Sequence, residues 1–271
     1  MARKFLASAL LALAVLSPAA WAGRSCETKP ATVASVERGL RLAQRTHDAL
    51  EAQHAREGTR VVLLARAGQD LSKYDLRYSH MGIAWRTADA AGRPAWRVLH
   101  KLNACGTATA DIWRQGLGEF FLDDVWRHEA AWTVPAPQVQ QQLLALLSED
   151  ARAVQLHHAP YSLVSYPWAQ RYQQSNQWMI ETLAMAVEPA ATTRQRAQAW
   201  LQLRGYEPTT LRLRTLTRLG GRLTAANVAF DDHPDARRFG GYIDTVTADS
   251  VLAWMERSGL GGPVVRLAET D

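Results

Sequence analysis

The 271-residue sequence has few cysteines, no internal repeats and no low-complexity linker, and it contains no long apolar run beyond its first residues. These absences favour one domain over two independent ones and argue against a membrane span in the body of the chain. The basic residues are interspersed with acidic ones, and clusters such as Arg212, Arg214, Arg218 and Arg222 have no aromatic residues between them. Nucleic-acid binding is therefore not supported.

The first residues have the pattern of an export signal. Arg3 and Lys4 precede an apolar run from Phe5 to Val15, and the small-x-small triplet Ala20, Trp21, Ala22 follows. The sequence predicts a cleaved signal peptide over residues 1–22 and a periplasmic protein with no stable membrane anchor after cleavage. Net charge falls from +5 to about +3 when Arg3 and Lys4 are removed.

The two cysteines, Cys26 and Cys105, are predicted to form a disulfide, because two cysteines in a protein of an oxidising compartment are more often bridged than free. In the chain-entropy model, closing a loop of that length stabilises by roughly 4 to 5 kcal/mol. A reactive Cys105 is the alternative, because Gly106 beside it would let a ligand approach the backbone. A lipid-bearing Cys26 is disfavoured, because the residues before it do not form the lead-in that lipoprotein processing uses.

Apolar periodicity predicts an α+β fold, a small antiparallel sheet flanked by helices, in one domain over residues 23–271. Helices are expected at 31–56, 137–150, 193–205 and from Thr247, and strands at 60–66, 76–85, 96–102 and 263–267. Residues 113–121 suggest a loop or short turn, and residues 161–185 a helix in two parts. A C-terminal helical extension begins at about residue 193.

Three residues could together perform nucleophilic chemistry, which needs an attacking atom, a base and a group that orients the base. His80 lies in a strand with small neighbours, Gly82 and Ala84, that leave room beside its ring. His100 lies on the next strand, within reach of a cross-strand pair. Ser175 begins a helix, where N–H groups favour negative charge. The alternative for Ser175 is a plain helix N-cap.

The strand SHMGIAW, a second strand with a polar residue and a later nucleophile at a helix start resemble the circularly permuted papain-like (NlpC-type) amidases and acyltransferases. That resemblance implies a similar fold and the order histidine, polar residue, cysteine, which falls here on His80, His100 and Ser175. Serine instead of cysteine is a departure, because a thiol at a helix start ionises readily whereas a hydroxyl depends on its base. Tyr78, Asn176, Gln177 and Trp178, which lie beside these positions, are predicted to bind substrate.

A more extensive resemblance covers nearly all of the chain after the signal. The segments AGQDLSKYDLRYSHMGIAW, VLHKLNACGTA, GLGEFFLDD, SNQWMIETLA and YIDTVTADSVLAWM are similar to those of a bacterial exported family catalogued as domain of unknown function 2145. Motifs of this length are specific. The resemblance implies no biochemical activity.

Asp231, Asp232, His233 and Asp235 have the composition of a metal site. Their spacing fits no calcium loop, and nearby Arg237 and Arg238 favour a salt-bridged loop instead. The sequence therefore predicts no metal and no cofactor.

Because nothing in the sequence compensates for the missing thiol, the preferred hypothesis is a binding or assembly module of the cell envelope. Its partner would be an envelope component or a small substrate. A serine-dependent hydrolase or acyltransferase acting on an envelope amide or ester is the alternative hypothesis.

Overall fold

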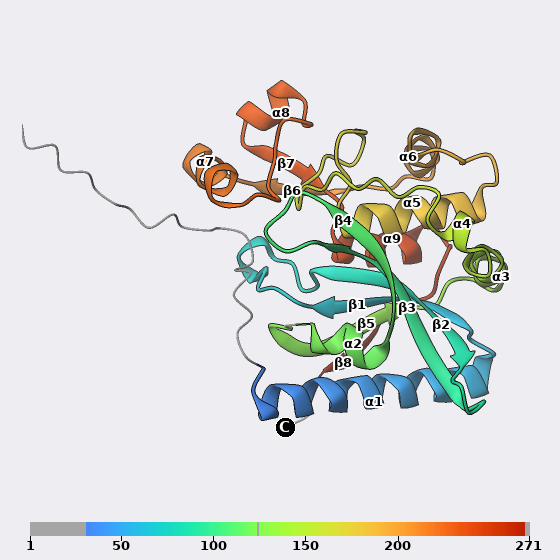
Figure 1. Ribbon diagram of the computed structural model, residues 1–271. Helices are drawn as coiled ribbons and strands as arrows, with labels where there is room; N and C mark the ends of the chain where they lie inside the picture. The colour runs from blue at the N-terminus through green and yellow to red at the C-terminus, as the bar shows by residue number, and fades with distance from the viewer. Residues whose placement is uncertain (1–30, 124, 269–271) are drawn as a thin grey trace, which may run out of the picture.

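The computed structural model describes residues 31–123 and 125–268, and its centre is a six-stranded antiparallel sheet in the order β4-β3-β2-β1-β5-β8 (Figure 1). The strands are β1 (Val61–Ala67), β2 (His80–Ala88), β3 (Pro94–Asn103), β4 (Ala110–Gly116), β5 (Arg127–Thr133) and β8 (Val265–Ala268). A separate two-stranded sheet pairs β6 (Thr209–Arg212) with β7 (Tyr242–Thr245). The predicted signal peptide and Cys26 lie outside the described residues.

Helices cover both faces of the large sheet (Figure 1). On one face lie α1 (Val33–Glu57) and α2 (Leu117–Leu122), and on the other α3 (Pro137–Leu147), α5 (Ser175–Val187) and α9 (Ala248–Arg257). The remaining helices are η1 (Ser72–Tyr74), α4 (Asp150–Ala153), α6 (Arg194–Leu203), α7 (Thr215–Thr224) and α8 (Asp235–Phe239). No described helix is long and apolar enough to span a bilayer.

Strand β1 is apolar at nearly every position because it is buried on both faces. Val61, Leu63 and Ala65 pack in the core beneath α5, whereas Val62 and Leu64 pack in the core beneath α1. Side chains alternate across a strand, so a continuous apolar run is what a central strand between two helical layers requires.

The structure confirms an antiparallel sheet flanked by helices, and it confirms that the last strand joins the sheet, since β8 pairs with β5. Two local expectations are wrong. Residues 113–121 are not a loop but the end of strand β4 and most of helix α2. The segment 161–174 is irregular, and the helix that follows starts only at Ser175.

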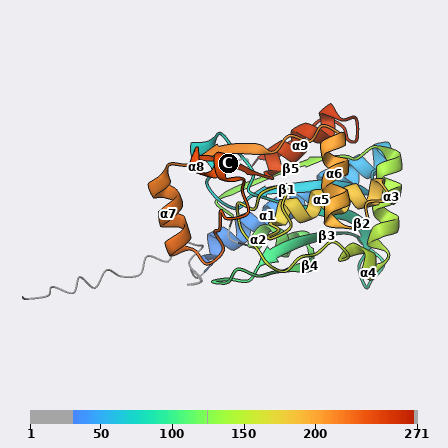
Figure 2. The same cartoon turned by 90° about the horizontal axis from the view of Figure 1, so that it is seen from above.

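The C-terminal part of the chain packs back onto the loop between β1 and β2. Leu211, Leu213, Phe230 and Ile243 form a small buried cluster. Partly buried Tyr74 and Leu76, from the β1–β2 loop, pack against this cluster. Figure 2 shows α7 and α8 together at one end of the molecule. The extension after residue 193 therefore covers the end of the sheet where β2 begins.

Candidate functional site

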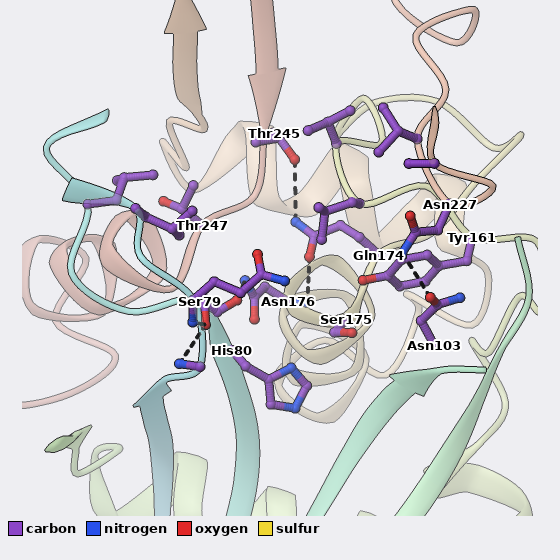
Figure 3. A pocket seen from close by; sticks show the side chains of 18 of the residues that line it. Ser79, His80, Asn103, Tyr161, Gln174, Ser175, Asn176, Asn227, Thr245 and Thr247 are labelled. Atoms are coloured by element: carbon purple, nitrogen blue, oxygen red, sulfur yellow. Dashed lines mark hydrogen bonds between the residues drawn. The ribbon is translucent and has the colours of Figure 1, made fainter. Parts of the chain in front are cut away.

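A cavity of about 1260 Å³ lies between the start of α5, the start of β2, the tip of the β3–β4 hairpin and the C-terminal segment (Figure 3). Its polar lining includes His80, Ser175, Asn176, Tyr161 and Asn103, and Leu211, Leu213 and Phe230 contribute apolar wall. The volume is above the usual range for small-ligand sites, which is roughly 300–1,000 Å³. Two of the three predicted catalytic residues, His80 and Ser175, thus meet in one cavity.

Ser175 is the first residue of α5 and not its N-cap. The cap is Gln174, whose side-chain oxygen accepts from the Asn176 backbone N–H at 2.9 Å. The N-cap interpretation of Ser175 is therefore wrong, because the side chain of Gln174 and not the Ser175 hydroxyl caps the N-terminus of α5. It lies instead at the positive end of the α5 dipole, 5% exposed and lining the cavity.

His80 and His100 form a hydrogen-bonded pair that ends on an amide. His80 Nε2 lies 2.8 Å from His100 Nδ1, and His100 Nε2 lies 2.8 Å from Gln115 Oε1. An amide oxygen can only accept, so His100 carries its proton on Nε2 and its Nδ1 is an acceptor. His80 must then donate from Nε2, which makes Nδ1 its basic nitrogen.

The surroundings of His100 keep its ring neutral. His100 is fully buried, and burial together with the nearby Arg66 charge lowers its pKa to about 4. Phe120 packs against both imidazoles, with ring centroids 5.9 Å from His80 and 5.3 Å from His100. A neutral His100 keeps Nδ1 available as an acceptor at neutral pH.

Gly82 provides space for His100. A Cβ at Gly82 would lie 3.0 Å from His100 Cβ and 2.6 Å from a Val98 methyl carbon. Any larger residue would thus force the neighbouring strand away. Gly82 therefore allows close packing of β2 against β3 at His100, and the expected space for a ligand beside the His80 ring stays a prediction.

Two polar links on either side of Ser175 fix α5 to the histidine strands. Asn176 Oδ1 accepts from the Met81 backbone N–H at 3.0 Å, and its Nδ2 donates to the Ser79 carbonyl at 3.4 Å. Asn176 therefore binds β2 on both sides of His80. Two residues before Ser175, Gln173 Oε1 accepts from Lys101 Nζ at 2.8 Å, and Lys101 is the neighbour of His100 on β3.

Tyr161 brings a phenol to Ser175, and Figure 3 shows its ring pointing toward that residue. Burial raises the pKa of Tyr161, and hydrogen bonding with the hydroxyl and backbone N–H of Ser175 opposes that rise. The phenol therefore remains protonated at neutral pH and can donate a hydrogen bond. Ser175 and His80 both line the cavity, and no direct hydrogen bond joins them in the described structure.

The predicted substrate-binding residues are placed differently from one another. Asn176 and Tyr78 line the cavity, although the Tyr78 hydroxyl donates to buried Glu129. Gln177 is buried and accepts from Ser165 Oγ at 2.6 Å, and Trp178 is fully buried in the core beneath the sheet. Substrate binding by these four residues stays a prediction.

Two other sites were considered from the sequence, a reactive Cys105 and a metal-binding loop at residues 231–235. Cys105 lines the cavity but is not a free thiol. Its expected partner Cys26 lies outside the described residues, so the bridge between them stays a prediction. In the loop proposed for metal, Asp231 pairs with Arg171, and His233 bonds Asp232. No group of three metal-ligating side chains occurs in the described residues.

Three supporting residues were missed from the sequence, namely Gln115, Tyr161 and Gln174. Gln115 lies on the strand that was taken for a loop. Tyr161 lies fourteen positions before Ser175 in an irregular segment with no periodicity. Only for Gln174 was there a local signal, because it directly precedes the helix that it caps.

A family model described as "Uncharacterized protein conserved in bacteria (DUF2145)" matches residues 53–255. Comparison with curated proteins and with solved structures gave no match. The papain-like resemblance of the motifs thus stays an expectation.

Proposed function

Since the chain belongs to the bacterial DUF2145 family, whose description names no activity, we propose its function from the site: a serine-dependent hydrolase or acyltransferase acting on an amide or ester. The observation that carries this proposal is the His80–His100–Gln115 chain, which leaves Nδ1 as the base nitrogen of a histidine in the same cavity as Ser175. Such a chain supplies the base on which a hydroxyl nucleophile depends. It therefore offers the compensation for the missing thiol that the sequence did not reveal.

In the proposed reaction, Ser175 Oγ attacks the substrate carbonyl carbon while His80 Nδ1 takes the hydroxyl proton. The carbonyl π-bond opens to an oxyanion, toward which the protonated Tyr161 hydroxyl can donate. The oxyanion then collapses, the bond to the amine or alcohol breaks, and His80 returns its proton to that leaving group. Water or another acceptor attacks the resulting acyl-serine by the same steps.

The setting of this activity is also a proposal. The signal-like N-terminus supports export to the periplasm, where envelope amides and esters would be the substrates. The order His80, His100, Ser175 and the position of Ser175 at a helix start support the likeness to permuted papain-like enzymes. A Cys26–Cys105 bridge fits the same oxidising compartment.

A fluorophosphonate probe, which phosphonylates activated serines with loss of fluoride, tests the proposal. The wild type is expected to be labelled, and Ser175→Ala is expected to abolish labelling because it removes the proposed nucleophile from the cavity that holds His80. Ser72→Ala is the matched control, since Ser72 bonds Asp70 on the exposed surface. Labelling that persists in Ser175→Ala would remove Ser175 from the mechanism.

A non-catalytic binding module is the second candidate, and the missing hydrogen bond between Ser175 and His80 favours it. In that case the wild type would stay unlabelled but retain an envelope component in a pull-down. A Ser175→Cys variant would gain thiol reactivity at low pH without gaining turnover. Hydrolysis of a peptidoglycan fragment or lipid by the wild type would exclude this candidate.

A further inference from the structure

Helix α7 turns its polar side toward the protein and its apolar side toward solvent. Leu216 is 81% exposed and Leu219 is 52% exposed, and the two lie three residues apart on one face of the helix. Thr217 and Gly221 line the cavity instead. A surface helix ordinarily buries its apolar stripe against the core, so this orientation leaves a face without a partner within the described residues.

The charge around this face has one sign. Residues 208–230 include four arginines and no other charged residue. Arg212 and Arg214 are exposed, and neither forms an ion pair with a carboxylate in the described part of the chain. Arg212 instead lies over the Tyr242 ring, with Cζ 4.7 Å from the centroid.

The nearest acidic residues in sequence do not offset this charge. Glu207 pairs with Arg257 at 3.8 Å, and Asp231 pairs with Arg171 at 3.1 Å. Arg212, Arg214, Leu216 and Leu219 are all exposed within eight consecutive residues, and we call this apolar and basic set the α7 surface. In Figure 1 this helix lies at the periphery of the molecule, beside α8, whose Phe239 is also exposed.

We propose that the α7 surface docks on an anionic phospholipid bilayer, with Leu216 and Leu219 inserted between lipids and the arginines at the headgroups. Exposed leucines beside cations are the pattern of helices that lie in a membrane interface. Arginines near an anionic lipid surface are attracted to its headgroups, and salt weakens that attraction. A second copy of the chain fits less well, because a two-fold contact would bring the same arginines together.

In this docked orientation, helix α7 lies between the cavity and the membrane surface. Thr217 and Gly221 are on the cavity side of the helix that would lie on the lipid. The bound protein would thus hold its cavity beside the bilayer surface. The inference does not depend on catalysis by Ser175.

Vesicle flotation with the chain from Gly23, the form left by the predicted cleavage, tests the proposal. The wild type is expected to bind vesicles containing phosphatidylglycerol at least tenfold more tightly than pure phosphatidylcholine vesicles, and added salt should weaken that binding. Leu216→Ser/Leu219→Ser and Arg212→Gln/Arg214→Gln should each reduce binding tenfold or more. Leu203→Ser and Arg38→Gln/Arg41→Gln are the matched controls, since Leu203 is 83% exposed on α6 and both arginines are exposed on α1.

Circular dichroism of every variant checks that the fold is retained. Equal binding to the two kinds of vesicle would overturn the proposal, and so would folded α7 variants that bind like the wild type. Concentration-dependent self-association that Leu216→Ser/Leu219→Ser abolishes, without vesicle binding, would identify a second copy as the partner and also overturn it. Ser175→Ala should bind vesicles like the wild type, so a failure of the proposed catalysis is distinguishable from a failure of docking.

Discussion

His80 Nε2 lies 2.8 Å from His100 Nδ1, and this contact sets which nitrogen of His80 can act as a base. His80 is the donor in this hydrogen bond, because the Gln115 side-chain oxygen can only accept and therefore holds the His100 proton on Nε2. One amide on the edge strand β4 thereby determines the tautomers of two imidazoles.

Replacing His100 should affect reactivity according to whether an acceptor remains for His80. His100→Leu removes the acceptor, so the His80 ring loses its orientation and the rate of fluorophosphonate labelling at Ser175 should fall by about a hundredfold, within the range of general-base contributions. His100→Asn keeps a side-chain oxygen and should recover part of that loss. The measurement is the labelling rate at fixed pH, with melting temperatures to confirm folding. Equal rates in His100→Leu and the wild type would show that His100 does not orient the base.

The lowered pKa of His100 also predicts how stability depends on pH. Its pKa is reduced from the usual 6.5 to about 4 in the folded protein, so between these values the unfolded chain binds more protons. Stability should therefore fall as the pH drops through this window, by about 2 kcal/mol between pH 7 and pH 4.5 from this residue alone. Urea unfolding at the two pH values should show a smaller loss for His100→Asn than for the wild type. An identical loss in both proteins would contradict burial of a neutral His100.

The assignment of the α5 cap to Gln174 predicts effects of different size for the two neighbouring residues Gln174 and Ser175. Ser175→Ala should change the free energy of unfolding by less than about 0.5 kcal/mol, because another residue caps the helix. Gln174→Ala should reduce it by about 1 kcal/mol or more, because it removes the acceptor for the Asn176 N–H. Chemical denaturation of the two variants provides the comparison. A larger loss for Ser175→Ala than for Gln174→Ala would restore Ser175 as a structural residue.

The parts of the fold that the sequence predicted are those in which burial follows the chain locally. The run RVVLLAR is apolar because β1 is buried on both faces, and α3 has an amphipathic stripe, so both were found. Strand β4 carries exposed and partly exposed residues at the sheet edge, and helix α2 has only six residues. Neither has a period long enough to detect, which is why residues 113–121 were taken for a loop.

The candidate site also contains residues that a local sequence pattern indicates and residues that it does not. His80, His100 and Ser175 were found because their residue types and their places on strands and a helix start are visible in the sequence. Gln115 and Tyr161 act through contacts made across the fold, which depend on the β3–β4 register and on an irregular segment. A local pattern cannot supply such contacts. The sequence favoured a binding module because nothing in it compensates for the missing thiol, and the choice between a binding module and an enzyme stays a prediction.

The predicted Cys26–Cys105 bridge gives the last test, and it bears on the alternative nucleophile. Cys105 lines the cavity and is not a free thiol. If it pairs with Cys26, the intact mass of the unreduced protein should be lower by two hydrogens than after reduction. Reduction should also lower the free energy of unfolding by roughly 4 kcal/mol. A Cys26→Ser/Cys105→Ser variant is the control, because reductant should leave its stability unchanged.

Alkylation of native, unreduced protein separates the two roles of Cys105. Iodoacetamide should not modify it while the bridge is intact. Should Cys105 be alkylated, and should that alkylation block a hydrolysis that survives in Ser175→Ala, then Cys105 would be the nucleophile and the bridge would be wrong. Because Cys105 and Ser175 line the same cavity, this pair of measurements assigns the reacting atom regardless of which substrate is used.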